Sequence, residues 1–398
     1  MFNCNKLAMA TFYINKDKFQ QRGEDPQQMF NSKVLDSLAE KLIGGKNYEV
    51  CWQSGRNEGL LAKLVTPLRS FYICLSKADP GEGRNSYLQS SPTAFAIYIK
   101  EVIEQRKKGE FVVALRSKGR AYLTDYQRFV MRILLTIGVK AIDLTPYNLL
   151  KDVVEFSSIE DMINTRHASE RANNNPTFFT DEGENYHLYG KTFGANGKET
   201  ALLCYAMMKI SSKPIRLFQI LDNGESSLSQ EDINAFSLFE KYYNTPTIEI
   251  LDDTYEIDDF TSQAYPDTSA LKLRQPRFIY NLLEKTKGIK KCALCDCRIS
   301  PLVQAAHIYS VADIKKNRSL TDNEKVRMAT DGNNGMWLCM HHHKLFDSSI
   351  LRISPQRIYY VDTDSFDSEF IKESLKESNL PALYTTPESC KYFSMRKF

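Results

Sequence analysis

Residues 334–347 read N-G-M-W-L-C-M-H-H-H-K-L-F-D, and they hold three of the six histidines of the chain. A fourth, His307, lies upstream in the sequence A-A-H-I, and a Cys-x-x-Cys pair, Cys292 and Cys295, lies further upstream. Histidine moves protons near neutral pH, and histidine and cysteine both bind metal ions. Residues 290–350 therefore carry the chemistry that the rest of the chain must support.

Two short-spaced pairs of residues in this region predict a structural zinc site. They are Cys292 with Cys295 and Cys339 with His342. Zinc in structural sites takes four nitrogen or sulfur ligands in a tetrahedron, and each pair supplies two of them from a single turn. Cys297 could replace Cys295 as a ligand, and His341 could compete with His342, although the spacing from Cys339 favours His342.

A second metal site can be built from the same stretch. If a helix begins near Cys339, His343 and Asp347 lie one turn apart on one face. An imidazole and a carboxylate so placed can hold a divalent cation whose other positions are open to water and phosphate oxygens. Taken alone, the pattern favours the plainer alternative of a surface histidine and a helix-end carboxylate.

The motif A-A-H-I followed by N-G-x-x-L-C-x-x-H-H-x-L-F-D resembles the HNH nuclease family, whose fold is a ββα-metal finger. The segment R-Q-P-R-F at residues 274–278, with Leu282, Leu283 and Cys292, also resembles the approach to that domain in HNH restriction endonucleases. The resemblance covers about residues 275–353, and residues 1–270 show no comparable likeness.

The resemblance implies a role for four residues. His307 corresponds to the general base on the first strand, and Asn334 to the middle asparagine that orients this base. His343 corresponds to the final histidine, a ligand of catalytic Mg²⁺ or Mn²⁺, and Asp347 occupies the position of a second ligand. Many members carry Asp or His directly before the base, where this chain has Ala306, so weak Mg²⁺ affinity without DNA is expected.

Phosphodiester hydrolysis by these four residues and their metal ion needs a deprotonated water in line with the leaving oxygen. A neutral imidazole with a pKa near ~6.5 can take that proton, and the cation can stabilise the charge that grows on phosphate and leaving oxygen. The expected products carry 5′-phosphate and 3′-hydroxyl ends. Candidate phosphate contacts are Arg298, Lys344 and Arg352, although solubility explains each almost as well.

The composition is that of a soluble globular protein, with 42% apolar and 25% charged residues. No apolar run approaches the ~20 residues that span a bilayer, and the N-terminal residues do not form a signal peptide, so we expect a cytoplasmic protein without membrane contact. Nine scattered cysteines indicate reduced thiols rather than a disulfide framework. The chain lacks a G-x-x-x-x-G-K-[ST] loop, so ATP dependence is not predicted.

The positive charge is concentrated beside the motif. Residues 281–360 hold 13 Lys and Arg against 7 Asp and Glu (+6), and residues 361–398 hold 5 against 7 (−2). Since the whole chain has a net charge of +3, residues 1–280 contribute −1. A polyanionic partner is therefore expected at the C-terminal module.

Patterns along the chain predict an α+β protein. Apolar residues repeat at helical spacing after Val34, Phe95 and Phe129, and short apolar runs at 71–75, 111–115 and 215–221 indicate strands. An acidic, turn-rich stretch at 252–268 reads as a linker. The predicted domains are a mixed α/β region at 1–270, possibly of two lobes, for recognition or regulation, a zinc-stabilised ββα-metal (HNH) domain at 271–360, and a tail at 361–398.

Three functions fit these features. The leading hypothesis is a sequence-specific endonuclease acting on double-stranded DNA, such as a type II restriction enzyme, with a homodimer for symmetric cutting. The second is an antiviral effector nuclease that is silent until a signal binds the N-terminal region. The third is a non-catalytic, zinc-stabilised DNA-binding protein.

Overall fold

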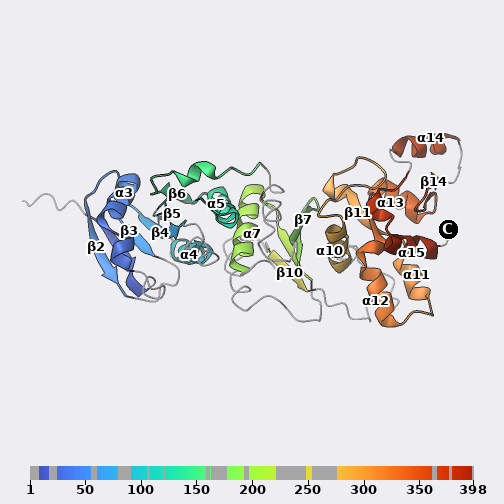
Figure 1. Ribbon diagram of the computed structural model, residues 1–398, viewed down its shortest axis with the longest axis horizontal. Coiled ribbons are helices and arrows are strands. Elements are labelled where there is room, and N and C mark those ends of the chain that lie inside the picture. The colour runs from blue at the N-terminus through green and yellow to red at the C-terminus, as the bar shows by residue number, and fades with distance from the viewer. Residues whose placement is uncertain are drawn as a thin grey trace, which may run out of the picture. The chain divides into compact units, whose positions relative to one another are not determined.

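The computed structural model describes residues 9–17, 25–54, 61–78, 91–104, 108–117, 119, 122–157, 162, 177–191, 197–220, 248–252, 276–360, 365–375 and 379–396. The chain divides into two compact units. Unit 1 comprises residues 1–174, 193–212 and 228–247, and unit 2 comprises residues 175–192, 213–227 and 248–398. Helices and sheets in both confirm the predicted α+β class (Figure 1).

Unit 1 contains a six-stranded sheet in the order β2-β1-β3-β4-β5-β6. Its strands are β1 (Ala10–Asn15), β2 (Tyr48–Gln53), β3 (Ala62–Val65), β4 (Ser70–Lys77), β5 (Gly109–Arg116) and β6 (Lys140–Asp143). All run parallel except β3, which is antiparallel to both β1 and β4. The central strands β4 and β5 read as unbroken apolar runs because both of their faces are buried.

The helices of unit 1 follow from local sequence signals. They are α2 (Pro26–Met29), α3 (Ser32–Ile43), α4 (Ser91–Ile99) with a π-helical turn at Lys100–Glu104, α5 (Asp125–Thr136), a 3₁₀ turn at Leu149–Asp152, and α7 (Gly197–Ser211). Helix α3 begins where the Asn31 side chain accepts from the Val34 backbone N–H, and it ends at Gly44, whose φ is +71°. Its buried stripe includes Val34 and Leu38, as the helical spacing predicts.

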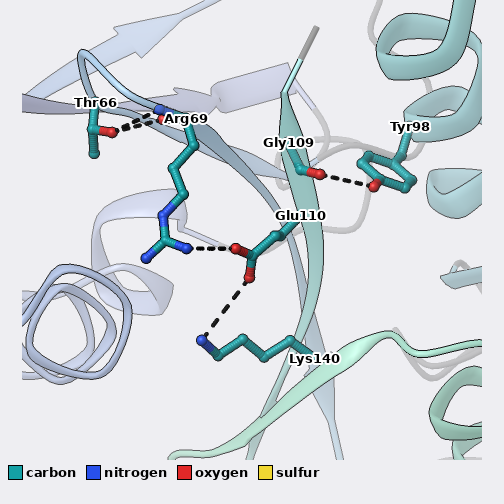
Figure 2. A network of polar contacts seen from close by, with 6 residues as sticks. All are labelled: Thr66, Arg69, Tyr98, Gly109, Glu110 and Lys140. Atoms are coloured by element: carbon teal, nitrogen blue, oxygen red, sulfur yellow. Dashed lines mark hydrogen bonds and ion pairs between the residues drawn. The ribbon is translucent and has the colours of Figure 1, made fainter.

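A polar network fixes the amino ends of three neighbouring strands (Figure 2). Arg69, directly before β4, lies 2.7 Å from the Glu110 carboxylate on β5, and Lys140 at the start of β6 lies 4.0 Å from the same carboxylate. The Thr66 hydroxyl donates to the Arg69 carbonyl and closes the turn into β4. These exposed ion pairs are worth about 0–1 kcal/mol each, so they add little to stability.

Unit 2 begins with a four-stranded sheet in the order β10-β9-β8-β7. Its strands are β7 (Thr177–Asp181), β8 (Tyr186–Gly190), β9 (Ile215–Gln219) and β10 (Ile248–Asp252). Strands β7 and β8 are antiparallel, and β8, β9 and β10 are parallel. Phe178 packs edge-on against Tyr280, and Lys290 forms an ion pair with Glu182, so this sheet shares a core with the segment that follows.

The C-terminal part of unit 2 is built on two antiparallel strands that are joined by a long connection, residues 308–334. Strands β11 (Val303–His307) and β12 (Gly335–Cys339) pair antiparallel, with Val303 opposite Cys339 and His307 opposite Gly335. Between them lie α11 (Val311–Lys316), α12 (Asp322–Thr330) and a 3₁₀ turn at Gly332–Asn334, and α13 (Met340–Asp347) follows directly. This strand–strand–helix order is the one that the ββα-metal resemblance implies.

Other elements surround the hairpin. They are α10 (Pro276–Lys285), a 3₁₀ turn at Ser300–Leu302, β13 (Leu351–Ile353), β14 (Ile358–Tyr360), α14 (Ser365–Ser374), a 3₁₀ turn at Ala382–Tyr384, and α15 (Pro387–Met395). Phe278, Leu282 and Leu283 are buried on α10, as its apolar stripe predicts. Tyr384, Tyr392 and Phe393 lie in the same buried core.

The predicted domain boundary near residue 270 falls within residues 253–275, which are outside the described residues. The division at 270 and 360 therefore stays a prediction. Within the described residues, no helix combines the length and the apolar character needed to cross a bilayer.

Candidate active site and metal centre

The four predicted zinc ligands come together where the turn after α10 meets the start of α13. One ligand atom from each of Cys292, Cys295, Cys339 and His342 lies within 4.8 Å of the other three. His342 Nδ1 is 3.5 Å from the Cys292 sulfur and 3.2 Å from the Cys339 sulfur, and the sulfurs of Cys295 and Cys339 are 4.0 Å apart. Zinc with ordinary bond lengths sets tetrahedral ligand atoms roughly 3.5–3.8 Å apart. The cluster therefore fits a zinc ion with little adjustment.

The His342 ring is oriented for this role by α14. The Ser374 hydroxyl donates to the Ile371 carbonyl at 2.7 Å, so its oxygen accepts from His342 Nε2 at 3.2 Å. The ring proton is then on Nε2, and the lone pair of Nδ1 faces the sulfurs. Burial lowers the pKa of His342 to about 4, which keeps the imidazole neutral at pH 7.

The Cys292 and Cys339 thiols carry their protons when no cation is bound. Burial raises the pKa of Cys292 to about 12, and it also raises the pKa of Cys339. A bound zinc ion would deprotonate these thiols, so binding is coupled to proton release. The two alternative ligands, Cys297 and His341, are not among the four residues of this cluster, and the His341 ring lies against Phe370.

His307 ends β11 with one face of its ring against Phe278 and its Nε2 beside a backbone carbonyl. Its imidazole stacks on the Phe278 ring of α10, with centroids 3.7 Å apart and planes 13° apart. Its Nε2 lies 2.9 Å from the Ala329 carbonyl. A carbonyl can only accept, so Nε2 carries the proton and the lone pair is on Nδ1. A neutral imidazole in this tautomer can remove a proton through Nδ1.

Asn334 holds the segment that follows His307. This side chain is fully buried; its Oδ1 accepts from the Tyr309 N–H at 2.8 Å, and its Nδ2 donates to the carbonyls of Tyr309 and Met328 at 3.1 and 3.0 Å. Its own carbonyl accepts from the Ile308 N–H at 2.8 Å. The asparagine thus joins the exit of β11 to the end of α12, beside the Ala329 carbonyl that contacts His307.

His343 and Asp347 form a pair on α13. His343 Nε2 lies 3.4 Å from Asp347 Oδ2, and His343 Nδ1 lies 2.9 Å from the Gln304 side-chain oxygen on β11. Because that oxygen accepts, Nδ1 carries the proton and Nε2 presents its lone pair beside the carboxylate. Burial lowers the pKa of His343 against the opposing effect of Asp347. The adjacent ligands of an octahedral Mg²⁺ lie roughly 3 Å apart, so the pair fits such an ion.

The position directly before the base contributes nothing to this pair. Ala306 is fully buried, and Gln304, two residues earlier on the same strand, is the β11 side chain that reaches His343. Of the three candidate phosphate contacts, Arg298 and Lys344 are exposed, whereas Arg352 is half-buried on β13. Exposure suits Arg298 and Lys344 for contact with a polyanion.

Three residues of the site were not predicted from the sequence. Phe278 was visible only as part of an apolar stripe, and neither Gln304 nor Ser374 belongs to a recognisable motif. Their roles come from contacts with residues 29 to 39 positions away along the chain, as in the Gln304–His343 and Ser374–His342 pairs. No local pattern encodes such contacts.

Comparison with protein families gives one finding for this region. The model of a family described as HNH endonuclease matches residues 292–353. The match spans the zinc cluster, the β11–β12 hairpin and α13, and it supports a nuclease that acts on DNA. Comparison with curated proteins gave no match.

Proposed function

We propose that the protein is a sequence-specific endonuclease that hydrolyses phosphodiester bonds of double-stranded DNA by a one-metal mechanism. The observation that carries the proposal is the ring of His307, whose Nε2–H is bound to the Ala329 carbonyl and whose Nδ1 therefore has the lone pair. This arrangement lies inside the segment that matches HNH endonucleases.

In the proposed mechanism, His307 Nδ1 removes a proton from a water molecule positioned opposite the leaving 3′ oxygen. Phe278 keeps the ring plane fixed, and Asn334 keeps the strand exit in place. His343 and Asp347 would hold Mg²⁺ or Mn²⁺, which supplies charge stabilisation at the phosphate and the leaving oxygen. The products then carry 5′-phosphate and 3′-hydroxyl ends. Arg298 and Lys344 would steer the DNA backbone, and Arg352 would do so less readily because it is half-buried.

We further propose a type II restriction role in the cytoplasm, with unit 1 reading the target and two copies of the chain cutting the two strands. The near-neutral charge of residues 1–280 supports recognition by a few base contacts rather than by wholesale phosphate binding.

A second candidate, a ligand-activated antiviral effector, is favoured by one feature of unit 1. Strands β4, β5 and β6 are parallel, so their carboxyl ends share one edge of the sheet. Open sheets of this kind bind small ligands at that edge.

The test is incubation of the full chain with unmodified phage DNA and Mg²⁺ or Mn²⁺, followed by sequencing of the fragment ends. Discrete fragments with a common terminal sequence and ligatable 5′-phosphates are expected without any added signal. Random ends would argue against the restriction role, and cleavage that requires an added small molecule would favour the effector.

His307→Ala is expected to reduce cleavage by at least ~10²-fold, because general bases contribute on that scale. His341→Ala is the matched control, since His341 is exposed on the same helix that carries His343. Equal cleavage by both variants would remove His307 from the mechanism. Absence of cleavage by the unmodified protein in either metal would favour a non-catalytic, zinc-stabilised DNA-binding protein.

A further inference from the structure

Residues 379–396 pack against the rest of unit 2. Helix α15 is tied to the rest of unit 2 by the Tyr392 hydroxyl, which donates to the Asp331 carboxylate at 2.7 Å, and by Ser389, whose hydroxyl accepts from Lys285 at 2.9 Å. Tyr392 and Phe393 lie in the buried core. The helix is therefore fixed where it ends, at Arg396.

Arg396 uses its two terminal nitrogens to join the two halves of the candidate active site. Its Nη1 donates to the Ile308 carbonyl at 2.9 Å, and its Nη2 donates to the Phe346 carbonyl at 2.8 Å. Its guanidinium carbon lies 3.6 Å from the centroid of the Phe346 ring. The planar group is thus held by two hydrogen bonds and by a stacked aromatic ring.

The two acceptors are the backbone neighbours of site residues. Ile308 directly follows His307, and Phe346 directly precedes Asp347. The Phe346 carbonyl belongs to the last turn of α13, and it accepts from the Ser349 N–H at 3.2 Å as well as from Arg396. A cation at this end also complements the helix dipole.

Arg396 acts on the same strand exit as Asn334, from a different element. The Ile308 N–H donates to the Asn334 carbonyl, and the Ile308 carbonyl accepts from Arg396. Asn334 anchors the exit of β11 to α12, whereas Arg396 anchors it to α13. Of these two anchors, it is Arg396 that connects the base-bearing strand to the metal-binding helix.

We propose that Arg396 is a positioning residue that sets the distance between the general base His307 and the metal pair His343–Asp347. This proposal rests on the proposed function for the roles of those residues. A lysine could not replace it, because a single ammonium lacks the planar fork that reaches two carbonyls from fixed directions. Both terminal nitrogens of Arg396 already donate to backbone carbonyls, which distinguishes Arg396 from an arginine that binds DNA phosphate.

The first experiment follows the histidine side chains of the full-length, zinc-loaded protein by NMR, in unmodified chain, Arg396→Gln and Arg396→Lys. Signals of His307 and His343 are expected to shift in both variants, while those of His342 and His187 stay in place. Arg357→Gln is the matched control, because Arg357 is exposed in the turn between β13 and β14. Unchanged His307 and His343 signals, or equal shifts in all four histidines, would overturn the proposal.

The second experiment measures DNA cleavage by the same proteins. Loss of positioning should lower kcat at least ~10-fold and leave KM within about twofold, since the misplaced groups act in the transition state. The zinc content of Arg396→Lys should match that of Arg357→Gln, and cleavage is compared at a temperature where both variants are folded. A flatter dependence of KM on salt in Arg396→Gln would overturn the proposal in favour of direct phosphate contact.

The two proposals fail in different ways. If the unmodified chain does not cleave DNA, the proposed function fails, while the NMR comparison still decides whether Arg396 couples the two halves of the site. If the chain cleaves DNA and Arg396→Lys cleaves it equally well, the proposed function stands and the positioning role is refuted.

Discussion

Replacing Asn334 by alanine is expected to destabilise unit 2 and to slow DNA cleavage. The side chain is fully buried and satisfies three backbone groups, the N–H and the carbonyl of Tyr309 and the carbonyl of Met328. A buried polar group that loses its partner costs about 1–3 kcal/mol. Three such groups give a loss of roughly 3–9 kcal/mol in the free energy of unfolding.

The matched control is Asn281→Ala. Asn281 is also an amide of unit 2, half-buried, and its Nδ2 donates to the Thr330 carbonyl at 2.7 Å. Loss of this hydrogen bond should cost about 1 kcal/mol. The assay is urea unfolding followed by the fluorescence of Trp337, with Trp52 replaced by phenylalanine, because the chain has two tryptophans.

Cleavage provides a second measure of the same change. A displacement of about 1 Å in the base can cost ~10²-fold in rate, so Asn334→Ala should lose at least that factor at a temperature where it is folded. A stability loss no larger than that of Asn281→Ala would refute the three-bond argument. Full activity in a measurably destabilised Asn334→Ala would refute its link to the base.

Zinc analysis should find one ion per chain; Cys339→Ser should lose it and Cys297→Ser should keep it, and equal zinc in the two variants would contradict the four-residue cluster. Because of His187, the free energy of unfolding should decrease as the pH is lowered. Burial lowers its pKa to about 3, so the unfolded chain takes up a proton below the ordinary value of 6.5 while the folded chain does not. Its contribution is complete above pH 6.5 and is lost toward pH 3, by at most about 1.4 kcal/mol per pH unit. Gly335→Ala should destabilise unit 2 by about 1–3 kcal/mol, because the new Cβ would lie 2.7 Å from the Phe278 ring; the measurement is urea unfolding.

Matched substitutions test the last two expectations. His187→Gln should remove about 2 kcal/mol of the stability difference between pH 7 and pH 5 relative to the unmodified chain. Gly45→Ala should be close to neutral, since no atom lies within 4 Å of its new Cβ. Parallel pH curves for His187→Gln and the unmodified chain, or equal losses for the two glycine variants, would contradict the reasoning.

The parts of the site that rest on short spacing could be predicted from the sequence. The pairs Cys292–Cys295 and Cys339–His342 each lie within one turn, so their convergence needed only that the two turns meet. His343 and Asp347 share a face because a helix brings residues four apart together. In the structure the four ligand atoms of the cluster lie within 4.8 Å of one another, and His343 Nε2 lies 3.4 Å from Asp347 Oδ2.

The parts that depend on distant pairing could not be predicted. The order of strands in unit 1, with antiparallel β3 between β1 and β4, is set by packing between segments rather than by the pattern within any strand. Arg396 meets partners 88 and 50 residues away, and its own neighbourhood reads as an ordinary basic end. Gln304 is exposed on β11, and no local sequence pattern indicates its contact with His343.

The β11–β12 hairpin has a consequence for folding kinetics. Its two strands are adjacent in space, yet residues 308–334 must be looped out before Val303 can face Cys339. Closing a loop of that length costs roughly 3 kcal/mol of chain entropy. An ion that joins Cys295 to Cys339 would bring the ends together in advance. We therefore expect unit 2 to refold faster when zinc is present at the start than when it is added later. The early rate should then depend on how fast the ion binds the thiols of the unfolded chain.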